Sequence, residues 1–507
     1  MALGENAPPG PAGPAAPPAE VSDAMLRSFD EDVRKAMAAF SMVGAAVAVV
    51  QGNKVIYNRG FGFRNQEKKQ PVTPRTSFRV GSNTKSMTSL LMAQYADEGR
   101  LKWDTHITDL WPEFRAPTPR LTESLRVADM FSMASGIGES PTIEFFMSGG
   151  GVDPLDAMRS VAYLPVISAP NKKYYYNNTL VATAIHASLT AEGTKPDALA
   201  DAYEAEIQKR VLAPIGMTDS GVGADLRVLT SDYADGYEID LSGKAGQVPF
   251  ISIDGIDPAG GAFSSSTDMA RYVITQMNEG VTPEGKRVAS RANVARTHKP
   301  GIAVPPDVSG GLPSAVLGDT KSLHYCMGWF RQKFNDGREL VWHSGGIDGF
   351  GTTMGFFPRE KTGFVVLTNL DPAASGRFTL SVQSSLMSRL FGLNADVPAA
   401  LASTAPQARE KRKKAAAETR PADRTAQKYL GLYSQGFTLD SPESGQLVLR
   451  HDIRSFPVRR ISGDTYLITG GPSVVLGKKV TFKKGANSMP VMTIEGFEPA
   501  RWLTGGF

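Results

Sequence analysis

The chain has 507 residues, 41% of them apolar and 21% charged, as expected for a soluble globular protein of two or three domains. No run of eighteen apolar residues occurs, so no membrane span is predicted. The net charge of +4 does not predict a nucleic-acid partner, because residues 401–427 alone hold seven Lys or Arg against three Asp or Glu.

The cysteine and histidine content predicts neither a disulfide nor a metal centre. Cys326 is the single cysteine and is expected to be a small buried hydrophobe. The six histidines are scattered without a His-Glu-x-x-His pattern, so we expect no metal and no other cofactor. The first twenty residues do not have the basic start and apolar stretch of a signal peptide. We expect a bacterial protein, periplasmic if a leader was removed and otherwise cytoplasmic, and the sequence leaves its oligomeric state open.

In chain order, residues 1–22 are rich in Pro, Ala and Gly and are predicted to be disordered. A helix is predicted over 21–39, a buried strand over 44–50 and, after a Gly-Asn turn, a second strand over 55–63. After residue 82 comes a helix with apolar residues at spacings of three and four, which Gly99 is placed to end.

The later part of the chain predicts two further units. Strands over 352–358 and 363–369 complete an α/β (α+β) domain, residues 23–400, whose antiparallel sheet takes its edges from both ends of the domain and is flanked by helices. Residues 401–427 form a charged, helical linker. Short alternating runs in 428–507, separated by Gly, Ser, Pro and Asn, predict a small antiparallel barrel.

The first candidate catalytic element is the pair Ser82 and Lys85. Residues three apart share a helix face, so the serine hydroxyl would lie beside the lysine at the start of a helix. A lysine in a dry site can lose its proton and then accept one from the hydroxyl. Ser-x-x-Lys arises by chance about twice in a chain of this length. This match is distinguished by its place between a predicted strand and an amphipathic helix.

The second candidate element is a tyrosine two residues before an asparagine, which occurs as Tyr175/Asn177 and as Tyr176/Asn178. A buried tyrosine beside cations can act as a base, and an asparagine can bridge the lysine and a substrate amide. Taken alone, the same residues are explained as an aromatic cluster that packs a loop.

The third candidate element is His343-Ser344-Gly345, followed by Gly346. On an edge strand, the glycine would let a substrate approach the backbone closely. The amide N–H groups of Gly346 and Ser82 could together form an oxyanion hole.

A literal Lys-Thr-Gly triplet begins at Lys361, between the two final strands of the domain. We predict that this triplet is a hairpin turn, with its glycine at the position the turn requires and its lysine facing water.

In this order, the three elements resemble those of the serine β-lactamase-like, or penicillin-binding-protein-like, hydrolases. The resemblance spans about residues 23–395 and is closest to the class C β-lactamase, D-aminopeptidase and family VIII esterase branches. It includes a loop, residues 127–139, in which Met133 replaces the histidine of the family pattern. The resemblance also implies a β-lactamase-like fold and a lipocalin-like character for the C-terminal barrel.

By position, the resemblance implies roles for the candidate residues. Ser82 would be the acylated nucleophile, Lys85 its proton acceptor and Tyr176 the partner base. Asn178 would orient the substrate; it is preferred with Tyr176 because the following residues match the family's small, apolar helix, although Tyr175 stays possible. His343 stands where many β-lactamases have lysine, a variant of the peptidase and esterase branches.

Other chemistries are not favoured. An α/β-hydrolase needs Gly-x-Ser-x-Gly, which is absent from the sequence. A catalytically silent module of the same fold is expected to lose the serine or the lysine, and both are present.

The substrate follows from the third element and the barrel. A histidine is mostly neutral at pH 7 and makes a weak anchor for a lactam carboxylate. The barrel resembles modules appended to D-aminopeptidase-type members of the family, and such a module could wall off the cleft and favour short peptides. The resemblance therefore implies a peptidase for short or D-residue-containing peptides, for example linearised cyclic peptides such as the linearised microcystin on which one family member of this shape acts. The alternative is a family VIII-type carboxylesterase or a weak β-lactamase.

Overall fold

The computed structural model describes residues 21–139, 152–223, 225–305, 319–421, 424–442, 446–451, 454–471, 475–485, 489–497 and 499–504. The predicted disorder of residues 1–22 lies almost wholly outside these ranges. Among the residues described, no helix combines the length and the apolar character that a membrane crossing requires.

The larger domain is built on an eight-stranded antiparallel sheet. In spatial order its strands are β3 (Gln70–Pro71), β2 (Lys54–Asn65), β1 (Gly44–Gln51), β13 (Thr362–Thr368), β12 (Phe350–Phe357), β11 (Glu339–Ile347), β10 (Phe330–Phe334) and β9 (Thr320–Tyr325).

Residues from opposite ends of the domain meet in the middle of this sheet. Ala45 of β1 pairs with Thr368 of β13, and the edges are β3 and β9. Edge strand β3 comes from the first group of strands in the domain and edge strand β9 from the last, so the prediction that both ends supply the edges is confirmed, as is the flanked antiparallel sheet. Sequence reasoning paired each strand with its neighbour in the chain and could not see the long-range β1–β13 ladder, which joins two strands that are each buried on both faces.

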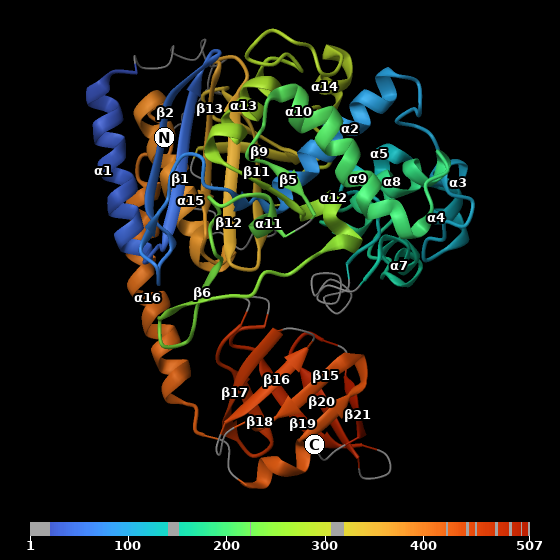
Figure 1. Cartoon of the computed structure of the whole chain (residues 1–507), viewed down its shortest axis with the longest axis vertical. Helices are drawn as coiled ribbons and strands as arrows, with labels where there is room; N and C mark the ends of the chain where they lie inside the picture. The colour runs from blue at the N-terminus through green and yellow to red at the C-terminus, as the bar shows by residue number, and fades with distance from the viewer. Residues whose placement is uncertain are drawn as a thin grey trace, which may run out of the picture.

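Helices cover both faces of the sheet (Figure 1). β1 shows why, because its side chains alternate: Ala45, Val47 and Val49 join one hydrophobic cluster while Ala46, Ala48 and Val50 join another. The first cluster lies under α1 (Asp23–Phe40), α15 (Pro372–Phe391) and α16 (Val397–Ala417). The second lies under helices that include α2 (Thr84–Asp97), α8 (Asn178–Ala191), α13 (Ser266–Met277) and α14 (Arg291–Thr297).

Smaller helices extend this second layer: α3 (Ile107–Leu110), α4 (Pro119–Ser124), α5 (Val127–Phe131), α7 (Pro154–Ser160), α9 (Leu199–Ile207), α10 (Ala213–Ile215), α11 (Leu226–Leu229) and α12 (Asp257–Gly260). Two small sheets complete the domain: β4 (Phe78–Arg79), β8 (Ala262–Ser264) and β5 (Gly221–Val222) in one, and the hairpin β6 (Tyr237–Ile239) and β7 (Ala245–Gln247) in the other.

The predicted charged linker is mostly helical. α16 begins before residue 401, and its first turns bury Leu401 and Ala405 against α15 and α1, so this part of the segment belongs to the core of the larger domain. Its second half leads away toward the barrel (Figure 1).

The C-terminal unit is a closed antiparallel barrel, as the alternating runs predict. Its strands are β14 (Gly431–Tyr433), β15 (Phe437–Asp440), β16 (Leu447–His451), β17 (Arg454–Ser462), β18 (Thr465–Ile468), β19 (Lys479–Lys484), β20 (Pro490–Ile494) and β21 (Ala500–Thr504). Alternate side chains of β16 and β17 point inward, where Tyr433, Tyr466 and Phe482 contribute to a packed interior.

Candidate active site

The serine of the first element lies in a short 3₁₀ turn, η1 (Gly81–Asn83), that connects β4 to α2. Gly81 takes a left-handed backbone conformation, with φ of 52°. The Asn83 side chain donates to the Thr352 hydroxyl, which donates to the Val80 carbonyl 2.9 Å away. These bonds hold the turn that carries Ser82 against β12.

Lys85 is completely buried one turn beyond the serine. Its Nζ lies 3.1 Å from the Ser82 hydroxyl, 2.5 Å from Asn178 Oδ1 and 2.8 Å from the Ala259 carbonyl oxygen of α12. Three acceptors around one amine suit an ammonium, which has three protons to donate. The first and second predicted elements therefore meet at this lysine.

Of the two tyrosines that fit the second element, Tyr176 is the one that lies in the site. Its ring stacks against the Lys85 amine, with 4.6 Å from Nζ to the ring centroid, and meets the Tyr325 ring edge-on at 6.1 Å. Tyr175 is 40% exposed. Asn177 caps α8, because its side-chain oxygen accepts the Leu180 amide.

A preceding loop holds the second element in place. The backbone carbonyl of Met133 accepts a hydrogen bond from the Tyr175 amide. The side-chain sulfur of Met133 accepts one from the Asn177 amide, 3.1 Å away. The Glu139 carboxylate accepts the amide of Asn178 at the first turn of α8. The methionine that replaces the family's histidine thus supplies a hydrogen-bond acceptor directly behind Tyr176.

His343 is 1% exposed and lies beside the same aromatic cluster. Its Nδ1 is 2.5 Å from the Ser344 carbonyl oxygen, which can only accept, so Nδ1 carries the proton. Nε2 is then the acceptor for the Tyr325 hydroxyl 3.3 Å away. Burial, helped by the nearby charge of Lys85, lowers the pKa of His343 to about 3. The imidazole is therefore neutral at physiological pH.

The prediction that the third element lies on an edge strand needs correction, because β11 lies between β12 and β10. The pairing with β10 reaches only to Trp342, however, whereas the pairing with β12 continues to Ile347. Among the described residues, 343–347 therefore pair with a strand on one side only. Ser344 is exposed on this stretch.

The two glycines of the third element lie against η1, the turn that carries Ser82. A Cβ atom on Gly345 would overlap the Val80 carbonyl oxygen, and one on Gly81 would lie 2.7 Å from the Gly346 nitrogen. This close backbone approach brings the Gly346 amide beside Ser82, as an oxyanion pair requires.

The Lys-Thr-Gly triplet lies away from this cluster, in the turn from β12 to β13 and at the start of β13. Lys361 is exposed, and its amine donates to the Met277 carbonyl at the end of α13. The predicted role of the glycine is wrong, because Lys361 itself takes the positive φ of 50°, whereas Gly363 lies in β13. Gly363 is needed there because a Cβ would lie 2.5 Å from a Val273 methyl group.

Sequence reasoning missed Tyr325, Met133 as an acceptor, Glu139 and the Ala259 carbonyl. Tyr325 lies on β9 in an aromatic run without a motif, and Ala259 contributes only a backbone atom. Burial raises the pKa of Tyr325 well above its usual range, so it stays a hydroxyl donor to His343. Among the described residues, no group of three or more His, Cys, Asp or Glu is arranged to hold a metal ion.

The family model described as Beta-lactamase matches residues 29–382, which include every candidate residue above. The chain belongs to the beta-lactamase family. The predicted resemblance to this family is therefore confirmed.

Two relatives show how far this similarity extends along the chain. The Unguisins hydrolase ungD of Aspergillus violaceofuscus is 26% identical over 365 residues, which are 67% of this chain and 60% of the relative. Protein flp of Staphylococcus aureus is 25% identical over 332 residues, 65% of this chain and 60% of the relative. The chain thus spans less than two thirds of the length of these relatives.

Two solved structures share the fold. The octameric penicillin-binding protein homologue from Pyrococcus abyssi has a TM-score of 0.60 at 22% identity and covers 94% of this chain and 99% of its own. A penicillin-binding protein from Bacillus halodurans has a TM-score of 0.53 at 17% identity and covers 70% of this chain and 97% of its own.

Proposed function

We propose that this hydrolase cleaves short peptides, including peptides with D-residues such as linearised cyclic peptides, through an acyl-enzyme on Ser82. The observation that carries the proposal is the neutral, buried His343 at the third element. A β-lactamase usually offers a permanent cation there, and this imidazole cannot supply one at neutral pH.

The stretch from His343 to Ile347 supports a peptide substrate. An extended peptide can add to a strand whose other side is open, with main-chain hydrogen bonds that do not depend on side-chain chirality. The relative named as an unguisins hydrolase is compatible with such a substrate.

In the proposed reaction, Lys85 or Tyr176, after giving up its own proton, takes the proton of the Ser82 hydroxyl, and Oγ attacks the carbonyl carbon. The Ser82 and Gly346 amides hold the oxyanion. Tyr176 protonates the leaving amine as the C–N bond breaks, and Asn178 orients the substrate amide. Water then hydrolyses the acyl ester on Ser82 and restores the enzyme.

A side-by-side assay of short D- and L-peptides, p-nitrophenyl esters and a chromogenic cephalosporin tests the proposal. We expect peptide cleavage to dominate and Ser82→Ala to reduce it by more than about a thousandfold. The exposed Ser124→Ala variant is the matched control and should keep full activity. Ester turnover without any peptide cleavage would favour a carboxylesterase, and full activity in Ser82→Ala would refute the site.

A further inference from the structure

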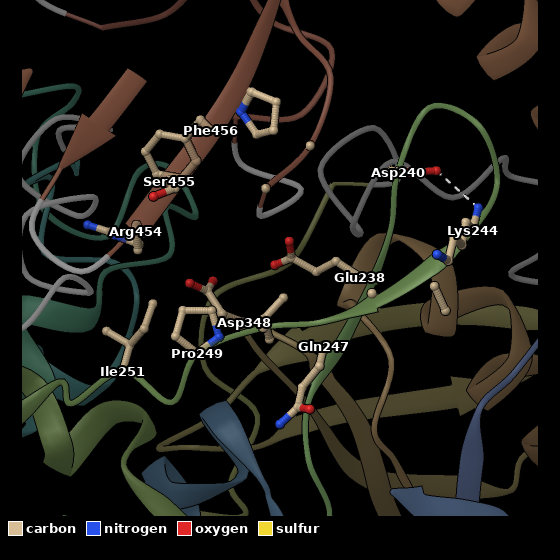
Figure 2. Close-up of a pocket in the computed structure, with 16 residues that line it drawn as sticks. Glu238, Asp240, Lys244, Gln247, Pro249, Ile251, Asp348, Arg454, Ser455 and Phe456 are labelled. Carbon is tan, nitrogen blue, oxygen red and sulfur yellow. Dashed lines mark hydrogen bonds between the residues drawn. The ribbon is translucent and has the colours of Figure 1, made fainter. Parts of the chain in front are cut away.

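A cavity of about 330 Å³ lies where the larger domain meets the barrel (Figure 2). Its walls come from the β6–β7 hairpin, from the turn between β11 and β12, and from the start of β17 in the barrel. The polar side chains that line it include Glu238, Asp240, Asp348, Lys244 and Arg454.

Two carboxylates, those of Glu238 and Asp348, lie in the middle of this cavity. Glu238 is 7% exposed. Among the residues that the structure describes, neither Oε1 of Glu238 nor Oδ2 of Asp348 has a hydrogen-bond partner. Figure 2 shows both carboxylates in the middle of the cavity, from different elements. A buried carboxylate oxygen without a donor is costly, so the pair is suited to a ligand that brings donors.

The electrostatics of the cavity favour a positive ligand. Burial, together with the charges of Asp348 and Asp371 and against that of Arg454, raises the pKa of Glu238 to about 9. Burial also raises the pKa of Asp348 to about 6, although Arg454 and Arg79 oppose this. Burial is the largest cause of both shifts, so a cation that enters the cavity would let Glu238 ionise.

The cavity is adjacent to the candidate active site. Asp348 follows Gly346 by two residues, in the turn directly after the stretch that we propose pairs with a peptide. At about 3.3 Å per residue, two residues correspond to about 7 Å along an extended chain. The hairpin that carries Glu238 is fixed to this turn, because the Tyr237 amide donates to the Gly349 carbonyl at 3.4 Å.

We propose that this cavity is a substrate subsite in which Glu238 and Asp348 bind a cationic group, an ammonium or a guanidinium, carried about two residues from the scissile bond. The inference rests on the proposed peptidase function, because the active-site strand leads the peptide to the cavity. A cation that enters pairs with Asp348 and with Glu238, whose carboxyl proton passes to the buffer.

The test measures binding to the full chain with Ser82→Ala, so that it needs no turnover. Three probes are titrated by calorimetry at neutral pH: N-acetyl-argininamide, N-acetyl-citrullinamide as its uncharged analogue, and alaninamide, whose cation is a free amino group. We expect at least one cationic probe to bind about tenfold or more tighter than the citrulline analogue. Which probe binds identifies the source of the cation as a side chain or an amino terminus.

Variants assign the effect to the two carboxylates. Glu238→Gln and Asp348→Asn should each remove the preference for the cation. Asp240→Asn, in the same cavity, should keep it, because the Asp240 carboxylate already accepts bonds from the Ser242 hydroxyl and the Lys244 amide. Melting curves of each variant show that it is folded.

A second readout does not depend on the variants. Titrations in buffers of different ionisation enthalpy should show release of up to about one proton per cation bound, since Glu238 is protonated at neutral pH in the free protein. Equal or undetectable binding of charged and uncharged probes, or a preference that survives in Glu238→Gln and Asp348→Asn, would overturn the subsite. Absence of peptide cleavage by the wild type would instead count against the proposed function.

Discussion

The histidine of the third element acts through its hydrogen bonds rather than through charge. Because Nδ1 of His343 donates to the Ser344 carbonyl, Nε2 accepts a hydrogen bond from the Tyr325 hydroxyl. The Tyr325 ring in turn packs on Tyr176. This arrangement connects His343 to Tyr176, the proposed base of the second element, without any change of protonation.

Replacing His343 by alanine should therefore reduce both stability and activity. The buried Tyr325 hydroxyl loses its acceptor, which costs about 1–3 kcal/mol in the free energy of unfolding. The value of kcat/KM should fall as Tyr176 loses its support. Urea unfolding and peptide kinetics check both effects. Lys361→Ala is the comparison and should change stability by less than about 0.5 kcal/mol, because Lys361 is exposed. The opposite pattern would return the catalytic role to the literal Lys-Thr-Gly.

At the scale of the elements, β11 packs closely against η1, the turn that carries Ser82. This packing is possible because Gly81 and Gly345 have no side chain at the contact. Gly345→Ala introduces a methyl group into the Val80 carbonyl, so β11 must move away from Ser82. We expect kcat/KM to fall at least about a hundredfold while the protein stays folded, because misplacement of catalytic groups by about 1 Å has effects of this size.

The matched control for this prediction is Gly376→Ala in α15, where a Cβ atom meets nothing within 4 Å. An alanine in a helix interior stabilises by about 0.5–1 kcal/mol relative to glycine. Circular dichroism and acylation by an active-site serine probe separate the two variants. Normal acylation of Gly345→Ala would show that the close approach is not needed.

Local elements of this molecule could be predicted from sequence because their causes are local. β1, its turn and β2 follow from apolar runs around Gly52, and α2 follows from apolar residues at helical spacing. The Ser82–Lys85 pair was found because its spacing carries the chemistry, and the structure places the two side chains 3.1 Å apart.

What could not be predicted depends on atoms without a sequence pattern. The Ala259 carbonyl that receives Lys85 and the sulfur of Met133 behind Tyr176 act through backbone or through an unusual acceptor. Spacing alone does not separate Tyr175 from Tyr176; the resemblance favours Tyr176, and the packing of the loop places it beside Lys85.

At the scale of the whole molecule, stability should depend on the buried acid between the domain and the barrel. The pKa of Glu238 is about 9, above its ordinary value, so the folded state favours the protonated form. The contribution of Glu238 to the free energy of unfolding is fully present below its ordinary pKa of about 4.3 and is lost as pH rises through 9. Asp348, Asp371 and Arg454 are the charged groups that act on it.

The free energy of unfolding should therefore fall between pH 5 and 9, by on the order of 5 kcal/mol, and Glu238→Gln should flatten this dependence. Urea midpoints across the range measure it. The exposed Asp201→Asn variant should follow the wild type. Identical slopes for wild type and Glu238→Gln would show that the acid is not protonated in the folded state.

The ladder between β1 and β13 has a consequence for how the chain folds. It joins Ala45 to Thr368, more than three hundred residues apart. Because non-local pairing is slow and must close a long loop, the centre of the sheet cannot form during synthesis until β13 has left the ribosome. Until then β1, which is apolar on both faces, stays unpaired on one side. An exposed apolar strand edge is prone to aggregation, and we expect a chaperone to bind β1 at this stage.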